Sequence, residues 1–348
     1  MTTDTNMQPA KIKIGISTYN DFEYVEMLLQ SIRWYTFTKH YDVVVCDDGT
    51  PECETKDRLR DVCARYGVTL IEHDQNMGIP ATWNHLVESL DKSGEIIVLL
   101  NNDVIVPPDW LEVCTHFFEA NEDHTNVGSM YWNPVNRVPK EAMRAWLPVM
   151  THTEFSTNDL VSGKPTDYTS AAHGTNRMEA RIGHGHGLGR VMAPCGACFA
   201  FTRKVWDATG QSFDERIKSF FEEIDFGTRC AERGMVSLGF PYPRPLHSHG
   251  ATFGANSEAL QPGERMRISR RIYREKWSVP QSDKTDFNRT HVRFMSQIPP
   301  VTVKYLTPDY DAEPQLRTRE DGSRIIVPKL VEVEGTFAEP ERPEGEEY

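Results

Sequence analysis

The feature that most constrains the fold is an alternation of short apolar runs with amphipathic stretches over the first hundred residues. Apolar runs of strand length occupy Lys11 to Ser17, Tyr41 to Cys46, Val68 to Glu72 and Glu95 to Leu100. Stretches of helical character lie between them, at Phe22 to Tyr35, Glu54 to Tyr66 and Pro80 to Leu90. Strands and helices that alternate through short links form a parallel sheet covered on both faces. The chain is therefore predicted to be an α/β protein with a mostly parallel sheet.

Composition narrows the classes of function. The net charge is −13, and residues 331–348 hold seven Glu and one Arg, so this end alone accounts for −6. Such a balance argues against nucleic acid or an anionic membrane as the partner, because both require clustered Lys and Arg. No apolar run approaches the roughly 18 residues of a spanning helix, and the seven Cys have no regular spacing. We expect a soluble protein in a reducing, cytoplasmic compartment.

The pattern loosens after a predicted helix at Trp110 to Glu119. Residues 133–190 are rich in Gly, Thr, Asn and His and predict long loops, after which Val191 to Phe201 predicts a strand. A helix at Glu223 to Arg233, a strand at Met235 to Phe240 and a helix at Arg265 to Lys276 follow. We expect a flexible N-terminus at 1–10, a main domain at 11–278, a C-terminal extension at 279–334 and a disordered acidic tail at 335–348.

Polar clusters follow three of the predicted strands. They are Ser17 to Asp21, Asp47-Asp48 and Asn101-Asn102-Asp103. In parallel sheets ligands bind at the carboxyl ends of the strands, so these clusters predict one binding site. Asp103 offers the oxygen ligand that Mg²⁺ or Mn²⁺ prefers, and Asp48 can accept a hydrogen bond from a base or a ribose. Acidic turns and a helix cap explain the same residues without a ligand, and both readings stay open at this point.

Motifs in order along the chain resemble the family 2 glycosyltransferases of the Rossmann-like GT-A fold, and especially the branch similar to rhamnosyl- and galactofuranosyltransferases. The stretches that carry the resemblance are Ile14 to Asn20, Val45 to Thr50, Asn76 to Asn84, Leu99 to Asp103, Cys195 to Lys204, Ser212 to Phe226 and His247 to Gly250. The resemblance spans about residues 11–277. It implies that a sugar is moved from a nucleoside-diphosphate sugar to an acceptor hydroxyl.

The resemblance also assigns roles to individual residues. It places Thr18, Tyr19 and Asp48 at the nucleoside, and Asn102 and Asp103 at the ribose and diphosphate. The same motifs add Ser17, Asn76, Gly78, Asn84 and Asn101 to the nucleotide-sugar site. Asp103 and His247 are implied to bind Mn²⁺ or Mg²⁺. Glu223 stands where the family has its catalytic base, with Glu222 and Asp225 beside it as alternatives.

This sequence departs from the family pattern at two positions. The acidic triplet that often reads Asp-x-Asp is Asn101-Asn102-Asp103 here, which leaves one carboxylate for the metal. Glu223 replaces the usual base Asp and is one methylene longer. We predict a metal-dependent inverting glycosyltransferase that uses a UDP- or dTDP-linked sugar and a glycan or protein acceptor. The alternative is a nucleotide-sugar or glycan-binding module of the same fold without turnover.

Other patterns receive structural interpretations. The turn from Gly15 to Asp21 lacks Gly-x-Gly-x-x-Gly, which argues against a dinucleotide oxidoreductase. Cys195 and Cys198 have no second pair at similar spacing, so we interpret them as core residues rather than zinc ligands. The run Gly183 to Gly187 is interpreted as a mobile lid or acceptor loop. We assign 133–190 and 279–334 to the acceptor face or to a homo-oligomer contact.

Overall fold

The structure is a computed structural model. It describes residues 11–38, 40–90, 94–132, 134–150, 189–191, 194–218, 220–240, 242–248, 262–279, 294, 297–309 and 311–337. The expected flexible N-terminus at 1–10, most of the loop-rich segment and the run Gly183 to Gly187 lie outside these residues.

The first half of the chain alternates strands and helices at the predicted places. Its elements are β1 (Lys11–Thr18), α1 (Glu23–Tyr35), β2 (Tyr41–Asp47), α2 (Glu54–Tyr66), β3 (Thr69–Glu72), α3 (Ile79–Ser89), β4 (Gly94–Asn101) and α4 (Trp110–Ala120). Local chemistry fixes several of the helix ends. Asp21 Oδ1 accepts the Tyr24 N–H at 2.8 Å at the start of α1, and Gly67 ends α2 with φ of 66°.

The described strands form a central sheet in the order β3-β2-β1-β4-β9-β6-β10-β8. Strands β3, β2, β1 and β4 are parallel, and β6 pairs with β10 in the same way. The strand β9 (Cys198–Thr202) runs antiparallel to β4 and to β6 (Val127–Trp132), and so joins the two parallel parts. The predicted α/β class with a mostly parallel sheet is confirmed.

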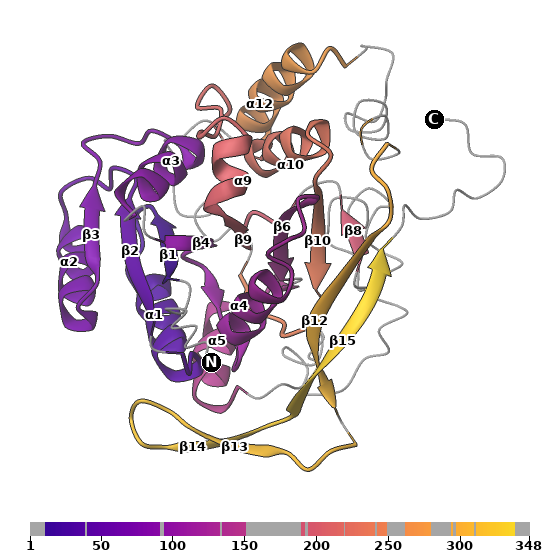
Figure 1. Cartoon of the computed structure of the whole chain (residues 1–348). Coiled ribbons are helices and arrows are strands. Elements are labelled where there is room, and N and C mark those ends of the chain that lie inside the picture. Colours follow the sequence, from indigo (N-terminus) through magenta and orange to yellow (C-terminus); the bar gives the residue numbers. More distant parts are fainter. Residues whose placement is uncertain are drawn as a thin grey trace, which may run out of the picture.

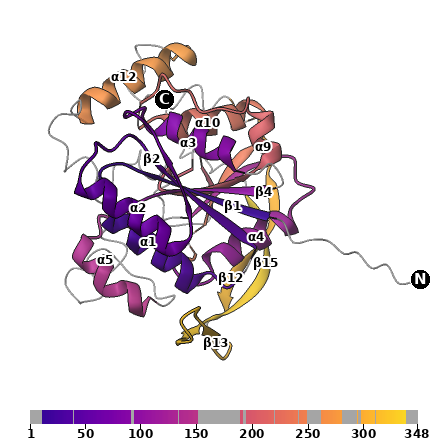
Figure 2. The ribbon, with the colours of Figure 1, turned by 90° about the vertical axis from the view of Figure 1, so that its left-hand side faces the viewer.

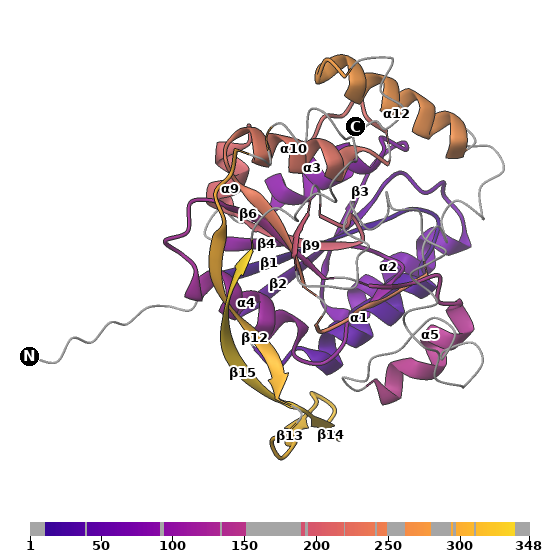
Figure 3. The same ribbon diagram turned by 90° about the vertical axis from the view of Figure 1, so that its right-hand side faces the viewer.

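Helices cover both faces of this sheet. Helices α3, α9 (Arg203–Ala208) and α10 (Glu222–Glu232) lie on one face, and α1, α2 and α4 on the other (Figures 2 and 3). Helix α12 (Pro262–Lys276) lies outside α10 (Figure 1). A buried aromatic group fills the space beneath α3, α9 and α10. Its members are Trp83, Phe199, Phe201, Trp206, Phe213 and Phe226.

A second, smaller sheet was not expected from the sequence. It has the order β5-β11-β7 and consists of β5 (Val104–Ile105), β11 (Leu246–His247) and β7 (Val135–Asn136). Its strands have two residues each, and so they leave no alternation of apolar and polar residues for a sequence pattern to detect. Pairing of His247 with Val104 brings His247 next to Asp103.

One predicted strand was wrong. The stretch Val191 to Phe201 divides into β8 (Gly189–Val191), antiparallel to β10 (Val236–Phe240), and β9, which is separated from β8 by β6 and β10 in the sheet. Between them Cys195 to Ala197 forms a tight loop, in which Cys195 O accepts the Cys198 N–H at 3.2 Å. The segment predicted as loops also contains the helix α5 (Lys140–Trp146) and a 3-10 turn, η1 (Leu147–Val149).

The C-terminal extension is folded as two antiparallel pairs. They are β12 (Val301–Asp309) with β15 (Lys329–Phe337), and β13 (Gln315–Thr318) with β14 (Arg324–Val327). The first pair runs beside α4, and the second projects at one end of the molecule (Figure 1). Asn121 at the end of α4 holds β12 through two hydrogen bonds with the Lys304 backbone, at 2.7 and 2.9 Å. Residues 335–337, which we expected in the tail, belong to β15, and 338–348 lie outside the described residues.

Among the described residues no helix is both long enough and apolar enough to cross a membrane.

A pair of truncations tests where the folded part ends. Removing 338–348 should leave the melting temperature unchanged within about a degree, because this Glu/Pro-rich segment has little apolar surface to bury. Removing 335–348 should lower it by about 2 °C or more, since Phe337 packs on Tyr305 with ring centroids 6.2 Å apart. Circular dichroism melts of both chains make the comparison. Equal losses would show that the acidic segment itself contributes to stability.

Candidate active site

A cavity of about 230 Å³ opens at the carboxyl ends of β1, β2 and β4. It is lined by Ser17, Thr18, Tyr19, Asp48, Asn76, Gly78, Asn101, Asn102, Asp103, Glu222, Glu223 and His247 from the predicted site. Asn84 and Asp225 are not in its lining. The three polar clusters that follow the strands therefore meet at one place.

Asp48 organises the loop that forms one wall. Its buried carboxylate accepts the Met77 N–H at 2.8 Å and the Gly78 N–H at 3.0 Å, and His73 Nδ1 lies 3.1 Å from Oδ1. Gly49 permits the close approach of this loop, because a Cβ there would lie 2.2 Å from the carbonyl carbon of Gln75. Among the described residues, three groups use most of the hydrogen-bonding capacity of Asp48, and one lone pair of Oδ2 has no partner.

The end of β4 is tied to the end of β1. Asn102 Nδ2 donates to Thr18 Oγ1 at 3.1 Å, and the Asn102 N–H donates to the Ser17 carbonyl at 3.2 Å. Thr18 Oγ1 in turn donates to the Asp21 carbonyl. These contacts orient Asn102 and place Asp103 at the rim of the cavity.

Asp103 and His247 face each other across 3.3 Å, measured from Oδ1 to Nε2. Both side chains are buried, at 6% and 7% exposure. His247 Nδ1 lies 2.7 Å from Asn136 Oδ1, and so Nδ1 carries the hydrogen in neutral imidazole. The lone pair of Nε2 is then turned toward a carboxylate. Two acceptors at this distance require a cation or a proton between them, and the pair therefore fits a metal ion.

Two carboxylates stand at the start of α10 on another wall. Burial raises the pKa of Glu223 to about 7, and it raises the pKa of Glu222 well above its ordinary value, with the charge of Glu223 adding to the effect. Glu222 Oε2 accepts the Phe221 N–H at 3.0 Å. In the described part of the chain, Glu223 Oε2 has no hydrogen-bond partner. Burial therefore favours the protonated form of both carboxyl groups.

The loop Cys195 to Ala197 lies between these groups. A Cβ on Gly196 would be 3.6 Å from Glu223 Cδ. Burial raises the pKa of the Cys195 thiol to about 12, and the charges of Glu223 and Asp103 contribute to this rise. Both carboxylates therefore approach the same loop. Cys195 and Cys198 are buried free thiols, which agrees with their interpretation as core residues.

Two predicted site residues have other partners. Asp225 is fully buried and pairs with Lys276 at 2.8 Å and Arg229 at 3.2 Å, while Trp277 Nε1 donates to it at 2.9 Å. Asp225 thus joins α10 to α12, and it is not among the residues that line the cavity. Asn84 binds the Phe213 backbone through both ends of its amide, at 2.6 and 3.0 Å. We assign both residues a structural role.

Sequence analysis missed several residues of the wall. They are Thr82, Trp83, Lys218 and Arg265. Lys218 Nζ donates to the Met77 carbonyl at 3.2 Å and so closes the loop that Asp48 holds. Lys218 lies in an irregular segment and Arg265 in the first turn of α12, where no periodic pattern marks an inward side chain. Only the packing of α12 over α10 brings Arg265 to the cavity.

Comparison with known proteins tests the predicted resemblance. Residues 13–182 match the family model described as Glycosyl transferase family 2. A mannosyltransferase of Pyrobaculum calidifontis, PcManGT, solved with GDP-Man and Mn²⁺, superposes with a TM-score of 0.50 at 14% identity, over 82% of this chain and 69% of its own. The match to the family 2 model over residues 13–182 supports the predicted resemblance, and the superposition confirms the GT-A fold.

Two curated relatives match parts of the chain. A dolichol-phosphate mannosyltransferase of Pyrococcus furiosus is 27% identical over 124 residues, which are 35% of this chain and 33% of that protein. An uncharacterized protein of Sinorhizobium fredii, y4gI, is 21% identical over 263 residues, which are 75% of this chain and 26% of that protein. The chain thus spans about a third and a quarter of the lengths of these relatives.

The structural role of Asp225 can be tested by its removal. Asp225→Ala leaves Lys276 and Arg229 without their shared buried anion and should lower the free energy of unfolding by about 3 kcal/mol. Nucleotide binding at the folded protein should persist, because the residue is outside the cavity. Urea unfolding gives the stability, with exposed Asp207→Ala as the control. Full stability together with lost sugar transfer would return Asp225 to the catalytic group.

Proposed function

We propose that this protein transfers a glycosyl group from a nucleoside-diphosphate sugar to a hydroxyl of a glycan or protein acceptor, with inversion at the anomeric carbon. One observation carries the proposal. The same cavity has the Asp103 and His247 pair on one wall and, on another, Glu223 with an unused carboxylate oxygen. Inverting transfer requires positive charge at the leaving diphosphate and a base at the acceptor hydroxyl.

The residues present fit a divalent cation. Asp103 and His247 would hold it, and Asn136 keeps the His247 lone pair turned toward that position. When bound, Mn²⁺ or Mg²⁺ supplies positive charge where negative charge grows on the diphosphate. With a single carboxylate in the triplet, the substrate phosphates and water complete the shell. Lys218 and Arg265 add fixed positive charge to the same cavity.

Glu223 moves the proton. In its deprotonated form it accepts the proton of the acceptor hydroxyl while the hydroxyl oxygen bonds to the anomeric carbon. The bond from that carbon to the diphosphate oxygen breaks, and its electron pair leaves with the nucleoside diphosphate. A pKa of about 7 suits a group that must gain and lose a proton near neutral pH.

The donor and the setting are part of the proposal. We expect a UDP- or dTDP-linked sugar. One curated relative and one similar solved structure are mannosyltransferases, the latter solved with GDP-Man, so GDP-mannose belongs in the same panel. The paired strands of 279–334 are assigned to acceptor or homo-oligomer contact. Seven free thiols support a reducing, cytoplasmic setting.

Removal of Asp103 tests the metal site. Asp103→Ala should abolish the Mn²⁺-dependent part of nucleoside-diphosphate affinity, because His247 alone is left to hold the ion. Calorimetric titrations of UDP, dTDP and GDP with and without Mn²⁺ measure it, with exposed Asp123→Ala as the matched control. Retention of the full Mn²⁺ effect in Asp103→Ala would exclude this residue as a ligand.

Removal of the Glu223 charge tests the base. Glu223→Gln should lower the turnover number by about 10²- to 10⁴-fold with donor binding kept. Wild-type turnover should rise as the pH increases through about 7, where Glu223 loses its proton, and the variant should lack this step. Glu222→Gln is the comparison, since Glu222 lines the same cavity but its Oε2 is held by the Phe221 N–H, and its substitution should change turnover only a few-fold. Collapse of Glu222→Gln with normal Glu223→Gln would exchange the two roles.

The same shift has a signed effect on stability. Because the folded-state pKa of Glu223 is raised from 4.5 to about 7, the native state binds more protons than the unfolded state in that interval. Stability from this group therefore falls as the pH rises from about 4.5 to 7, and Glu223→Gln should remove the fall. Urea unfolding at pH 5 and pH 8 measures this fall in stability.

The nucleotide-sugar panel separates the enzyme from the alternative function. If donors bind but neither transfer nor hydrolysis occurs, the result would instead favour a binding module.

A further inference from the structure

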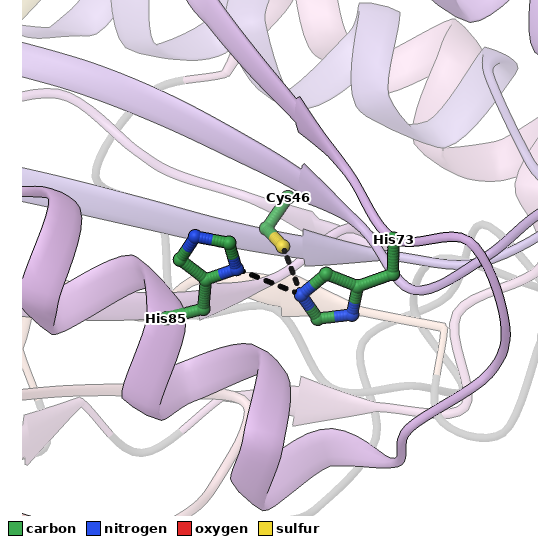
Figure 4. Close-up of side chains that lie close together, drawn as sticks. All are labelled: Cys46, His73 and His85. Carbon is green, nitrogen blue, oxygen red and sulfur yellow. Dashed lines mark hydrogen bonds between the residues drawn. The ribbon is translucent and has the colours of Figure 1, made fainter.

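A cysteine and two histidines that the proposed reaction does not use meet behind the Asp48 loop. Cys46 lies at the end of β2, His73 directly follows β3 and His85 is on α3. His73 Nε2 is 3.5 Å from Cys46 Sγ and 3.0 Å from His85 Nδ1 (Figure 4). The three ligand atoms all lie within 4.8 Å of one another. Three elements that are separate in the chain thus turn one sulfur and two nitrogens toward a common point.

The hydrogen bond to Asp48 fixes the state of His73. Asp48 accepts two backbone N–H groups, and it is therefore an acceptor toward His73 Nδ1, which lies 3.1 Å away. In neutral imidazole the other nitrogen, Nε2, then carries the lone pair. This lone pair points to Cys46 and His85. A carboxylate that holds one histidine nitrogen while the other faces the remaining ligands is the arrangement that supports metal-binding histidines.

Two of the three ligand spacings are close to those of a tetrahedral transition-metal site, and the third lies within 4.8 Å. Zinc bonds of about 2.3 Å to sulfur and about 2.0 to 2.1 Å to nitrogen place tetrahedral ligands about 3.5 Å apart for sulfur and nitrogen, and about 3.4 Å for two nitrogens. The Cys46 to His73 distance already has this value, at 3.5 Å. The two histidine nitrogens, at 3.0 Å, must separate slightly. The His85 side chain is exposed, so its ring can turn to open this gap.

The ligand types select the class of metal. A thiolate with two imidazoles suits Zn²⁺ and other borderline or soft transition metals, whereas Mg²⁺ and Mn²⁺ prefer oxygen ligands. Cys46 is buried and His85 reaches solvent, so an ion enters from the His85 side and water supplies a fourth ligand there. Binding of the metal as a thiolate complex displaces the Cys46 thiol proton, which passes to solvent.

We propose that Cys46, His73 and His85 form a binding site for a zinc-class transition-metal ion, separate from the Asp103 and His247 pair. An ion there joins β2, the start of the loop after β3, and α3. These elements carry Asp48 and both ends of the loop that Asp48 holds, so the ion stabilises one wall of the cavity. The proposal does not depend on sugar transfer, because it rests on a different set of side chains.

Cobalt substitution in the full chain tests the proposal. The protein is freed of metal with a chelator and titrated with Co²⁺ alone, and thiolate coordination gives a near-ultraviolet charge-transfer band. We expect the band to saturate at one Co²⁺ per chain and to disappear when Zn²⁺ is added. Zn²⁺ alone should also raise the melting temperature of the metal-free protein.

Substitutions assign the band to these side chains. Cys46→Ser should abolish the band. His85→Ala should weaken Co²⁺ binding at least about tenfold, because even the loss of a residue that only orients a metal ligand costs this much affinity. His85→Ala on the exposed face of α3 also keeps the test valid if the buried Cys46→Ser does not fold. Exposed Cys53→Ser and His124→Ala are the matched controls and should bind Co²⁺ as the wild type does.

Asp103→Ala separates the two metal sites. This variant should keep the cobalt band in full, whatever happens to its Mn²⁺-dependent nucleotide binding. No band at saturating Co²⁺ in the wild type would overturn the proposal. So would unchanged Co²⁺ affinity in His85→Ala, or loss of the band in Cys53→Ser.

Discussion

The register of three parallel strands is the constraint on which the rest of the structure depends. Strand β1 pairs with β2 and β4 so that Thr18 is opposite Asp47 and Ser17 is opposite Asn101. Each strand therefore ends at the same level, and the polar turn after each one enters the same space. A shift by one residue in either pairing would turn every side chain of that strand to the opposite face and separate the clusters. The apolar interiors of these strands, buried on both faces, hold the register.

Around this frame, hydrogen bonds rather than apolar packing position the groups of the cavity. Asp48 holds its loop by backbone N–H groups, and Asn102 is held by Thr18. His247 is held by Asn136, which comes from a two-residue strand. Buried polar groups are costly unless they are paired, so each of these contacts also fixes its orientation. Glu223 departs from this pattern with one oxygen that has no partner among the described residues, and its burial raises its pKa.

The carboxylates of α10 show how one acidic segment divides between structure and chemistry. Glu222, Glu223 and Asp225 all lie in the first turn of the helix. Asp225 faces α12 and meets Lys276 and Trp277, while Glu223 faces the loop at Gly196. The helical turn sends neighbours in different directions, so charge alone does not select the base. Asp48 also serves two groups. Besides the two backbone N–H groups of its loop, it contacts His73 Nδ1, and His73 belongs to the Cys46, His73 and His85 group outside the cavity.

The sequence by itself determined the α/β class, the strands and helices of the first hundred residues and the meeting of the clusters at Ser17, Asp48 and Asp103, because local periodicity and the geometry of parallel sheets suffice for these. Only the tertiary structure decided the rest. It divided 191–201 into two strands, brought Asn136 to His247 and Arg265 to the cavity, and left Asp225 and Asn84 outside the cavity lining. It also joined Cys46 to His73 and His85. The physical reason is that these outcomes depend on which elements pack together over long separations, and no short-range pattern in the chain encodes such contacts.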